Sequence, residues 1–184
     1  MSKMLIFSVL MFFCFSLPAQ DVYFTRSGHI YFISETDVID IDADNHQVAS
    51  FLDIETGKIQ FAVLIKSFQF SLATAKEHFN ESYMESDKFP QATFKGKIND
   101  MNTIDLKEQG VYHVHVTGEI TIRGITKNIT VPAEIQVSED GVNAGSVFLL
   151  AIADFNIRVP KVVEHRVAKQ VAVKVNMDYT PYKK

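Results

Sequence analysis

Residues 78–96, which read HFNESYMESDKFPQATFKG, decide the fold because they join a helix to a strand. Apolar side chains recur every three or four residues from position 72 into this segment: Leu72, Ala75, Phe79 and Tyr83. This spacing places them on one face of a helix. We therefore expect a helix over 72–84, with Ser71 as its N-cap. Pro90 favours an extended residue before it, and apolar or small residues then alternate with polar ones over 92–98. The segment thus predicts a helix, a short loop and a half-buried strand.

Other segments alternate in polarity in the same way and predict further strands. The candidate strands are 30–34, 48–54, 58–65, 92–98, 111–122, 125–137, 144–152 and 167–179. Arg123-Gly124 leaves room only for a tight hairpin, and Asp140-Gly141 is a turn signal, so successive strands should run antiparallel. Pro132 cannot donate to a strand ladder, so we expect an edge or a bulge there. Antiparallel strands with one apolar face form a sandwich or a closed barrel, and closure removes the exposed edges.

Residues 1–19 have the three parts of a secretory signal: a basic residue, an apolar run over 4–15, and the small-residue cleavage site Leu17-Pro18-Ala19. The apolar run of twelve residues is shorter than the roughly 20 of a membrane span, which favours a cleaved signal over an uncleaved anchor. Cys14 is the one cysteine, so its removal would exclude disulfides, thiolate catalysis and cysteine metal sites. We expect a single exported domain over 20–184, periplasmic or secreted.

Composition disfavours several function classes. Without the lysine of the signal, 17 basic against 22 acidic side chains leave a net charge of −5, which disfavours nucleic-acid binding and attachment to anionic lipid. No second long apolar run follows, so an integral membrane protein is not expected. The chain lacks the Gly-x-Ser-x-Gly and His-Glu-x-x-His motifs and a Gly-rich phosphate loop. An enzyme is therefore disfavoured, although catalytic groups assembled from separate strands leave no motif.

Four sets of polar residues could carry chemistry, and each has a plainer interpretation. His113 and His115 share a strand face, but no third ligand is evident, so no metal site is expected. A solvated acidic face is favoured over a calcium site for the alternating carboxylates Asp37, Asp40, Asp42 and Asp44. Surface positions are expected for the scattered histidines His29, His46, His78 and His165. Arg123 and Lys127 could meet a pyrophosphate or quinone head group, but solvent-facing turn positions are favoured.

Two segments carry a resemblance to a known family. Residues 78–96 and residues 116–132, VTGEITIRGITKNITVP, resemble the YceI-like family, and the resemblance runs from about His29 to about Tyr179. It implies an all-β fold: an exported, antiparallel, eight-stranded lipocalin-like barrel with one short helix covering an end. Some members of that family bind polyisoprenoid lipids or quinones inside the barrel. The resemblance therefore implies noncovalent binding, with carriage or storage, of a long apolar lipid and no other cofactor.

The inward strand faces are mainly Val, Ile and Phe, with small residues at Ser50, Gly96, Gly118 and Ala133. These small residues either leave room for a chain-like guest or relieve crowding at bends, and the resemblance favours the guest. The residues expected to line the cavity or its mouth are Phe61, Val63, Phe68, Phe70, Phe79, Phe94, Tyr112, Val114, Val116, Ile120, Ile135, Val171, Val173 and Val175.

The helix over 72–84 has two interpretations. It either covers one barrel end as core, or it is a lid over a mouth formed by Phe68, Phe70, Phe79 and Phe89. The rival hypothesis for the whole chain is a packed barrel that serves as an interaction or stress-response module. The sequence leaves open a monomer or a homodimer.

Overall fold

The computed structural model describes residues 22–106, 108–139 and 141–182. The predicted signal at 1–19 lies outside the described residues, so its cleavage stays a prediction. The strands are β1 Val22–Ser34, β2 Ile41–Asp53, β3 Lys58–Leu64, β4 Gln69–Phe70, β5 Gln91–Ile98, β6 Gly110–Ile122, β7 Ile125–Ser138, β8 Gly141–Ala151 and β9 Gln170–Pro181. The helical segments are η1 Ile65–Ser67, α1 Ala73–His78, η2 Phe79–Tyr83, η3 Met101–Thr103, η4 Ile152–Phe155 and η5 Lys161–Arg166.

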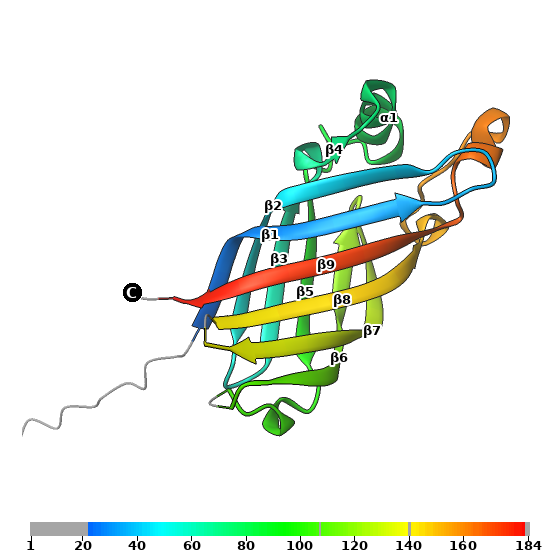
Figure 1. Cartoon of the computed structure of the whole chain (residues 1–184). Coiled ribbons are helices and arrows are strands. Elements are labelled where there is room, and N and C mark those ends of the chain that lie inside the picture. Colours follow the sequence, from blue (N-terminus) through cyan, green and yellow to red (C-terminus); the bar gives the residue numbers. More distant parts are fainter. Residues whose placement is uncertain (1–21, 107, 140, 183–184) are drawn as a thin grey trace, which may run out of the picture.

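Eight long strands close into a barrel, with α1 beyond one end (Figure 1). The hydrogen-bonded order is β1-β9-β8-β7-β6-β5-β3-β2, every pair is antiparallel, and β1 pairs with β2 to complete the circle. The two residues of β4 pair with β2 beyond the end of β3. The predicted eight-stranded antiparallel barrel with one short covering helix is therefore confirmed. No helix among the described residues is long and apolar enough to cross a membrane.

The first two strands are longer than predicted, because bulges break their alternation. β1 begins at Val22 and β2 at Ile41, whereas the predicted strands began at residues 30 and 48. The β1–β2 register shifts between Thr25 and Gly28 and again between Gly28 and Ile30. Each shift places two successive side chains on the same face, so the two-residue period used to find strands disappears there.

The helix lies where it was predicted, but its start differs. α1 ends at His78 and continues as the single π-turn η2 to Tyr83. Leu72, and not Ser71, is the N-cap, and no side chain bonds the free N–H groups there. The predicted Ser71 cap is therefore wrong. The apolar stripe still faces the barrel, since the Phe79 ring contacts that of Phe32 with 5.5 Å between ring centres.

The barrel end opposite α1 is filled by side chains. Val48, Leu52, Ile98 and Met177 are fully buried there, and Tyr179 lies among them. The Tyr179 hydroxyl lies 2.5 Å from the Ser50 hydroxyl, which in turn donates to the backbone oxygen of Gln60. Burial raises the pKa of Tyr179, with the Ser50 hydrogen bond opposing. This end is a packed core, and the barrel's free space lies toward α1.

Candidate ligand cavity

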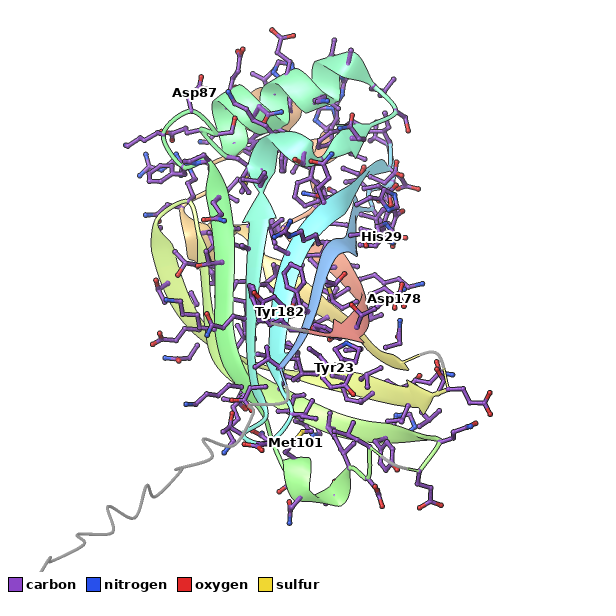
Figure 2. All side chains as sticks on the ribbon, turned by 90° about the vertical axis from the view of Figure 1, so that its left-hand side faces the viewer. Tyr23, His29, Asp87, Met101, Asp178 and Tyr182 are labelled. Carbon is purple, nitrogen blue, oxygen red and sulfur yellow. The ribbon has the colours of Figure 1, made fainter. Side chains whose placement is uncertain are left out.

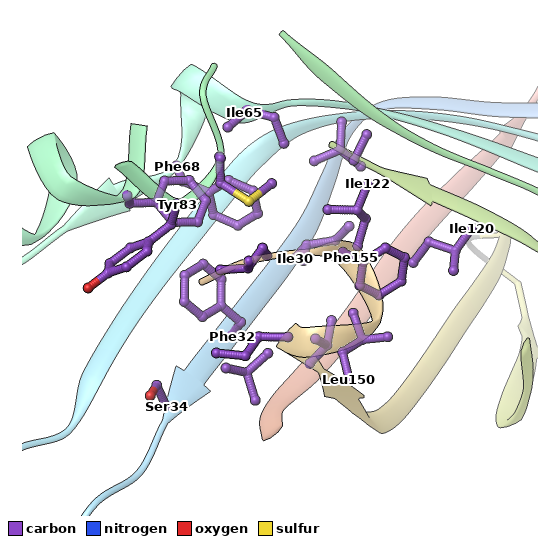
Figure 3. Close-up of a pocket in the computed structure, with 18 of the residues that line it drawn as sticks. Ile30, Phe32, Ser34, Ile65, Phe68, Tyr83, Ile120, Ile122, Leu150 and Phe155 are labelled. Carbon is purple, nitrogen blue, oxygen red and sulfur yellow. The ribbon is translucent and has the colours of Figure 1, made fainter. Parts of the chain in front are cut away.

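A cavity of about 680 Å³ occupies the half of the barrel that α1 covers (Figure 3). All eight long strands contribute to its wall, together with α1, η2 and the segment 152–167. The wall is overwhelmingly apolar, because strand alternation sends valine, isoleucine and phenylalanine inward and polar residues outward. The volume falls within the range of roughly 300–1,000 Å³ that is typical of small-molecule sites.

Aromatic rings concentrate at the helix-covered end of the cavity. The Phe32 ring on β1 contacts the rings of Phe68, Phe70 and Phe79, with ring centres 5.4, 5.9 and 5.5 Å apart. Phe79 also contacts Phe68 and Phe70 directly. The chain after β3 is thereby held over the barrel by a cluster of aromatic side chains. These edge-to-face, tilted and stacked contacts add about 0.5–1.5 kcal/mol per pair to the burial of the rings.

Most of the predicted lining residues do lie in the cavity wall. The twelve found there are Phe61, Val63, Phe68, Phe70, Phe79, Phe94, Val116, Ile120, Ile135, Val171, Val173 and Val175. Tyr112 and Val114 do not line it: both pack in the core of the opposite end, and the Tyr112 hydroxyl donates to the backbone oxygen of Asp105. β6 is 13 residues long, so its inward face spans both barrel ends. Contact of any of these residues with a ligand stays a prediction.

Three of the four small inward residues serve packing. Ala133 lines the cavity, but Ser50 is buried against Tyr179 at the packed end. Gly96 and Gly118 lie opposite each other in the β5–β6 ladder, and the Phe94 ring occupies the space where their side chains would stand. The room they leave is therefore taken by the protein itself.

Residues 152–163 close part of the wall, and apart from Ile152, the last residue of the predicted strand 144–152, they were not predicted to form a strand or helix. Ile152, Phe155, Ile157, Pro160 and Val163 all face the cavity, and Phe155 is only 2 % exposed. No regular period links these residues, because they lie on short 3-10 turns and loop. The signal available in the sequence was the high density of apolar side chains in this segment between two strands, which indicates that the segment packs against the barrel.

The same segment lies where the barrel wall is split. The ladder between β7 and β8 runs only from Glu134 opposite Gly145 to Ser138 opposite Gly141. Beyond it, the Ser146 hydroxyl donates to the Pro132 carbonyl over 2.6 Å, and η4 contacts β7. Pro132, predicted at an edge or bulge, is indeed just past the end of this ladder. Residues 125–133 of β7 and residues 146–151 of β8 are therefore joined through side chains and η4, and not through a backbone ladder.

Arg123 holds the covering elements together. It forms an ion pair with Glu85, which follows η2, and donates to the backbone oxygen of Asn156, which follows η4. Arg123 and Gly124 have φ values of 52° and 73°, as the predicted tight hairpin requires. Arg123 is thus neither a solvent-facing turn residue nor part of the cavity wall. Lys127 is exposed and lies outside the wall as well.

We expect Arg123→Ala to loosen both covering elements. Loss of a charged group with two partners should lower the free energy of unfolding by about 1–3 kcal/mol, measured by urea denaturation. Amide hydrogen exchange should accelerate at residues 80–90 and 152–157 and change little in the packed end. Lys127→Ala on the same hairpin is the matched control. Equal exchange rates in the two variants would contradict this role of Arg123.

Polar side chains of the wall lie mainly near α1 and at the ends of β1 and η5. The groups at these places are Ser34, Thr74, His78, Ser82, Tyr83 and Arg166, and two further polar side chains, Thr93 and Ser146, line the wall elsewhere. The Ser34 hydroxyl already accepts from the backbone N–H of Ala168 at 2.9 Å. A ligand with one polar end could therefore place that end among these groups and its apolar part deeper in the barrel.

The polar sets on the outer face differ from expectation in one respect. His113 lies 3.7 Å from Glu134, and no third candidate ligand joins them among the described residues. Asp42 and Asp44 lie on β2. His29 and His46, however, are not scattered: their rings stack with centres 4.2 Å apart.

An antiparallel barrel that encloses an apolar cavity under a helical cover has the architecture found in β-barrels that hold one small ligand. The chain belongs to the YceI-like family: the model of the YceI-like domain matches residues 26–179. This confirms the resemblance found in the two sequence segments. Among curated proteins, none matches the chain.

Solved structures share the fold at low sequence identity. A polyisoprenoid-binding domain from Saccharophagus degradans is 12 % identical, with a TM-score of 0.76 over 89 % of this chain and 100 % of that one. BcnA of Burkholderia cenocepacia is 18 % identical, with a TM-score of 0.67 over 81 % and 94 %. The YceI protein of Campylobacter jejuni is 16 % identical, with a TM-score of 0.55 over 99 % and 94 %.

Proposed function

We propose that this protein binds one long apolar lipid, a polyisoprenoid or an isoprenoid quinone, inside the barrel for carriage or storage. The observation that carries the proposal is the apolar cavity of about 680 Å³, to which every long strand contributes. A barrel that served only as a packed interaction module would be expected to fill this space with side chains. The similarity of the fold to that of the polyisoprenoid-binding domain from Saccharophagus degradans supports the same ligand class.

Burial of the lipid tail supplies the binding free energy. Each buried CH₂ contributes about 0.8 kcal/mol, so ten such groups contribute about 8 kcal/mol before the costs of association. A chain-like guest therefore needs few polar contacts. We place its tail against Phe61, Val116 and Val173, and its head among the polar groups near α1.

The helix then serves both as cover and as gate. Phe79 on η2 packs on Phe32 of β1, so movement of α1 and η2 would widen the entrance for a guest at that end. No step in this function breaks a covalent bond, and we infer a binding protein and not an enzyme. Because residues 1–19 are predicted to be a secretory signal, we propose that the protein performs this role outside the cytoplasm, in the periplasm or secreted. Whether the carrier is a monomer or a homodimer is left to the experiment below.

Native mass spectrometry of the protein from an exporting bacterial host tests the proposal. We expect a complex with one lipid per chain, and organic extraction should release a prenyl lipid or quinone. The same spectrum gives the oligomeric state. If the chain is purified empty, added isoprenoid should raise its melting temperature, because a ligand that binds only the folded state stabilises it. An empty barrel whose stability is indifferent to isoprenoids would favour the packed interaction module.

A further inference from the structure

Two histidines and an aspartate meet on the outer face of the barrel, away from the cavity. His29 on β1 lies with its Nε2 2.5 Å from an oxygen of Asp44 on β2, and its ring stacks on that of His46. One potential ligand atom of each residue lies within 4.8 Å of the other two. Figure 2 shows His29 at the periphery of the barrel, below the helical cover. We propose that His29, Asp44 and His46 bind a divalent transition-metal ion.

A bulge in the β1–β2 ladder creates this arrangement. Ile30 pairs with Asn45, but Gly28 pairs with Val48. The two β2 residues between these pairs, His46 and Gln47, therefore both lie opposite His29. Asn45 and Val48 are both buried, and His46 therefore lies on the outer face with Asp44. In a regular ladder, His29 would have one partner. The bulge instead lets its ring lie against His46 while its Nε2 reaches Asp44.

The donor set suits a transition metal more than calcium or magnesium. Imidazole nitrogen is a good ligand for zinc, copper and nickel, whereas calcium and magnesium take oxygen ligands. Three protein ligands with the remaining positions open to water are common in zinc sites, and two histidines with one carboxylate are an established combination. Elsewhere in residues 22–106, 108–139 and 141–182, no other three such side chains come together. The Irving–Williams order predicts the tightest binding for Cu²⁺.

The surroundings are accessible and mainly acidic. The side chains of His29 and Asp44 are 31 % and 40 % exposed, so a hydrated ion can reach them. Asp42 and Asp44 lie at alternate positions along β2, opposite Ile33 and Tyr31 of β1. The cation that faces this region across the β1–β9 ladder is Lys174, opposite Tyr31. The acidic charges along β2 favour the approach of a cation.

The site is independent of the proposed lipid function. His29 faces outward, while Ile30, the next residue, lines the cavity. The metal and the lipid would therefore occupy opposite sides of the same wall. A protein that proved to bind no lipid could still bind the metal.

Calorimetric titration of the tag-free protein with Zn²⁺ and with Cu²⁺ tests the proposal. We expect one ion per chain, with tighter binding of Cu²⁺, and no competition from an excess of Ca²⁺ or Mg²⁺. His29→Gln, His46→Gln and Asp44→Asn should each weaken binding by about tenfold or more, since loss of even an outer-sphere partner costs that much. His113→Gln is the matched control: it also removes an outward-facing histidine beside a carboxylate and should leave the affinity unchanged.

A spectroscopic measurement on the unaltered protein does not depend on the folding of any variant. In histidine side-chain NMR spectra, Zn²⁺ should shift the imidazole signals of His29 and His46 and leave those of His113 and His115 in place. Absence of stoichiometric binding would overturn the proposal. So would unchanged affinity in both histidine variants, or shifts at His113 in place of His29.

Discussion

Val173→Asp is expected to abolish lipid retention. Val173 lies on β9, is 8 % exposed, and faces the cavity opposite Phe32 and Phe148 on the neighbouring strands. A carboxylate there would have to be desolvated beside an apolar tail or keep water in the cavity, and the penalty is several kcal/mol per buried ion. A loss of about 3 kcal/mol corresponds to a roughly hundredfold weaker complex. Retention is measured as the lipid-bound fraction in native mass spectra and by isoprenoid titration.

Val147→Asp is the matched control, since it makes the same chemical change on the adjacent strand. Val147 is 59 % exposed, lies opposite Lys174 and is outside the cavity wall, so its substitution should leave lipid binding intact. Ala133→Phe tests the cavity without a charge, because its ring would occupy part of the space that the tail needs. Both cavity variants are compared with the unaltered protein by circular dichroism. Full lipid retention in a folded Val173→Asp protein would remove this residue from the ligand site.

The sequence predicted the fold well where alternation is unbroken. The strands expected at 92–98, 111–122 and 125–137 agree with β5, β6 and β7 to within one residue at each end. They could be found because each keeps one face inward for its whole length. β1 and β2 were cut short, because their bulges reverse the inward and outward positions partway along the strand.

The sequence could predict which side chains face the barrel interior, but not which of them lie along the cavity and which lie in the packed end. Alternation indicates that Tyr112 and Val116 face inward, yet only Val116 reaches the cavity. Which barrel end stays open depends on where loops and bulky side chains pack, and one strand does not contain that information. The His29–His46 contact was missed for a related reason: it depends on a register between two strands, which no spacing in the sequence states.

Gly118→Ala is expected to destabilise the barrel by about 3 kcal/mol, the upper part of the range for overpacking a core. An added Cβ would lie 2.5 Å from the Gly96 Cα, 2.5 Å from the Lys95 oxygen and 2.7 Å from the Phe94 ring. Two of these three neighbours are backbone atoms of the paired strand, so the crowding cannot be relieved by a rotamer change. Gly145→Ala is the matched control, because its Cβ would meet only the Val175 oxygen at 3.9 Å. That variant should be neutral or slightly stabilising.

The reason for the glycine pair can be tested with Phe94. Its ring lies over Gly96 and Gly118 and also lines the cavity, so the two glycines let one large side chain lie flat against the wall. Phe94→Ala should be destabilising alone, but it should reduce the cost of Gly118→Ala by removing one of the three clashes. Urea denaturation of the two single variants and the double variant gives this coupling. Strictly additive losses, or equal stabilities of Gly118→Ala and Gly145→Ala, would contradict the interpretation that the two glycines make room for the Phe94 ring.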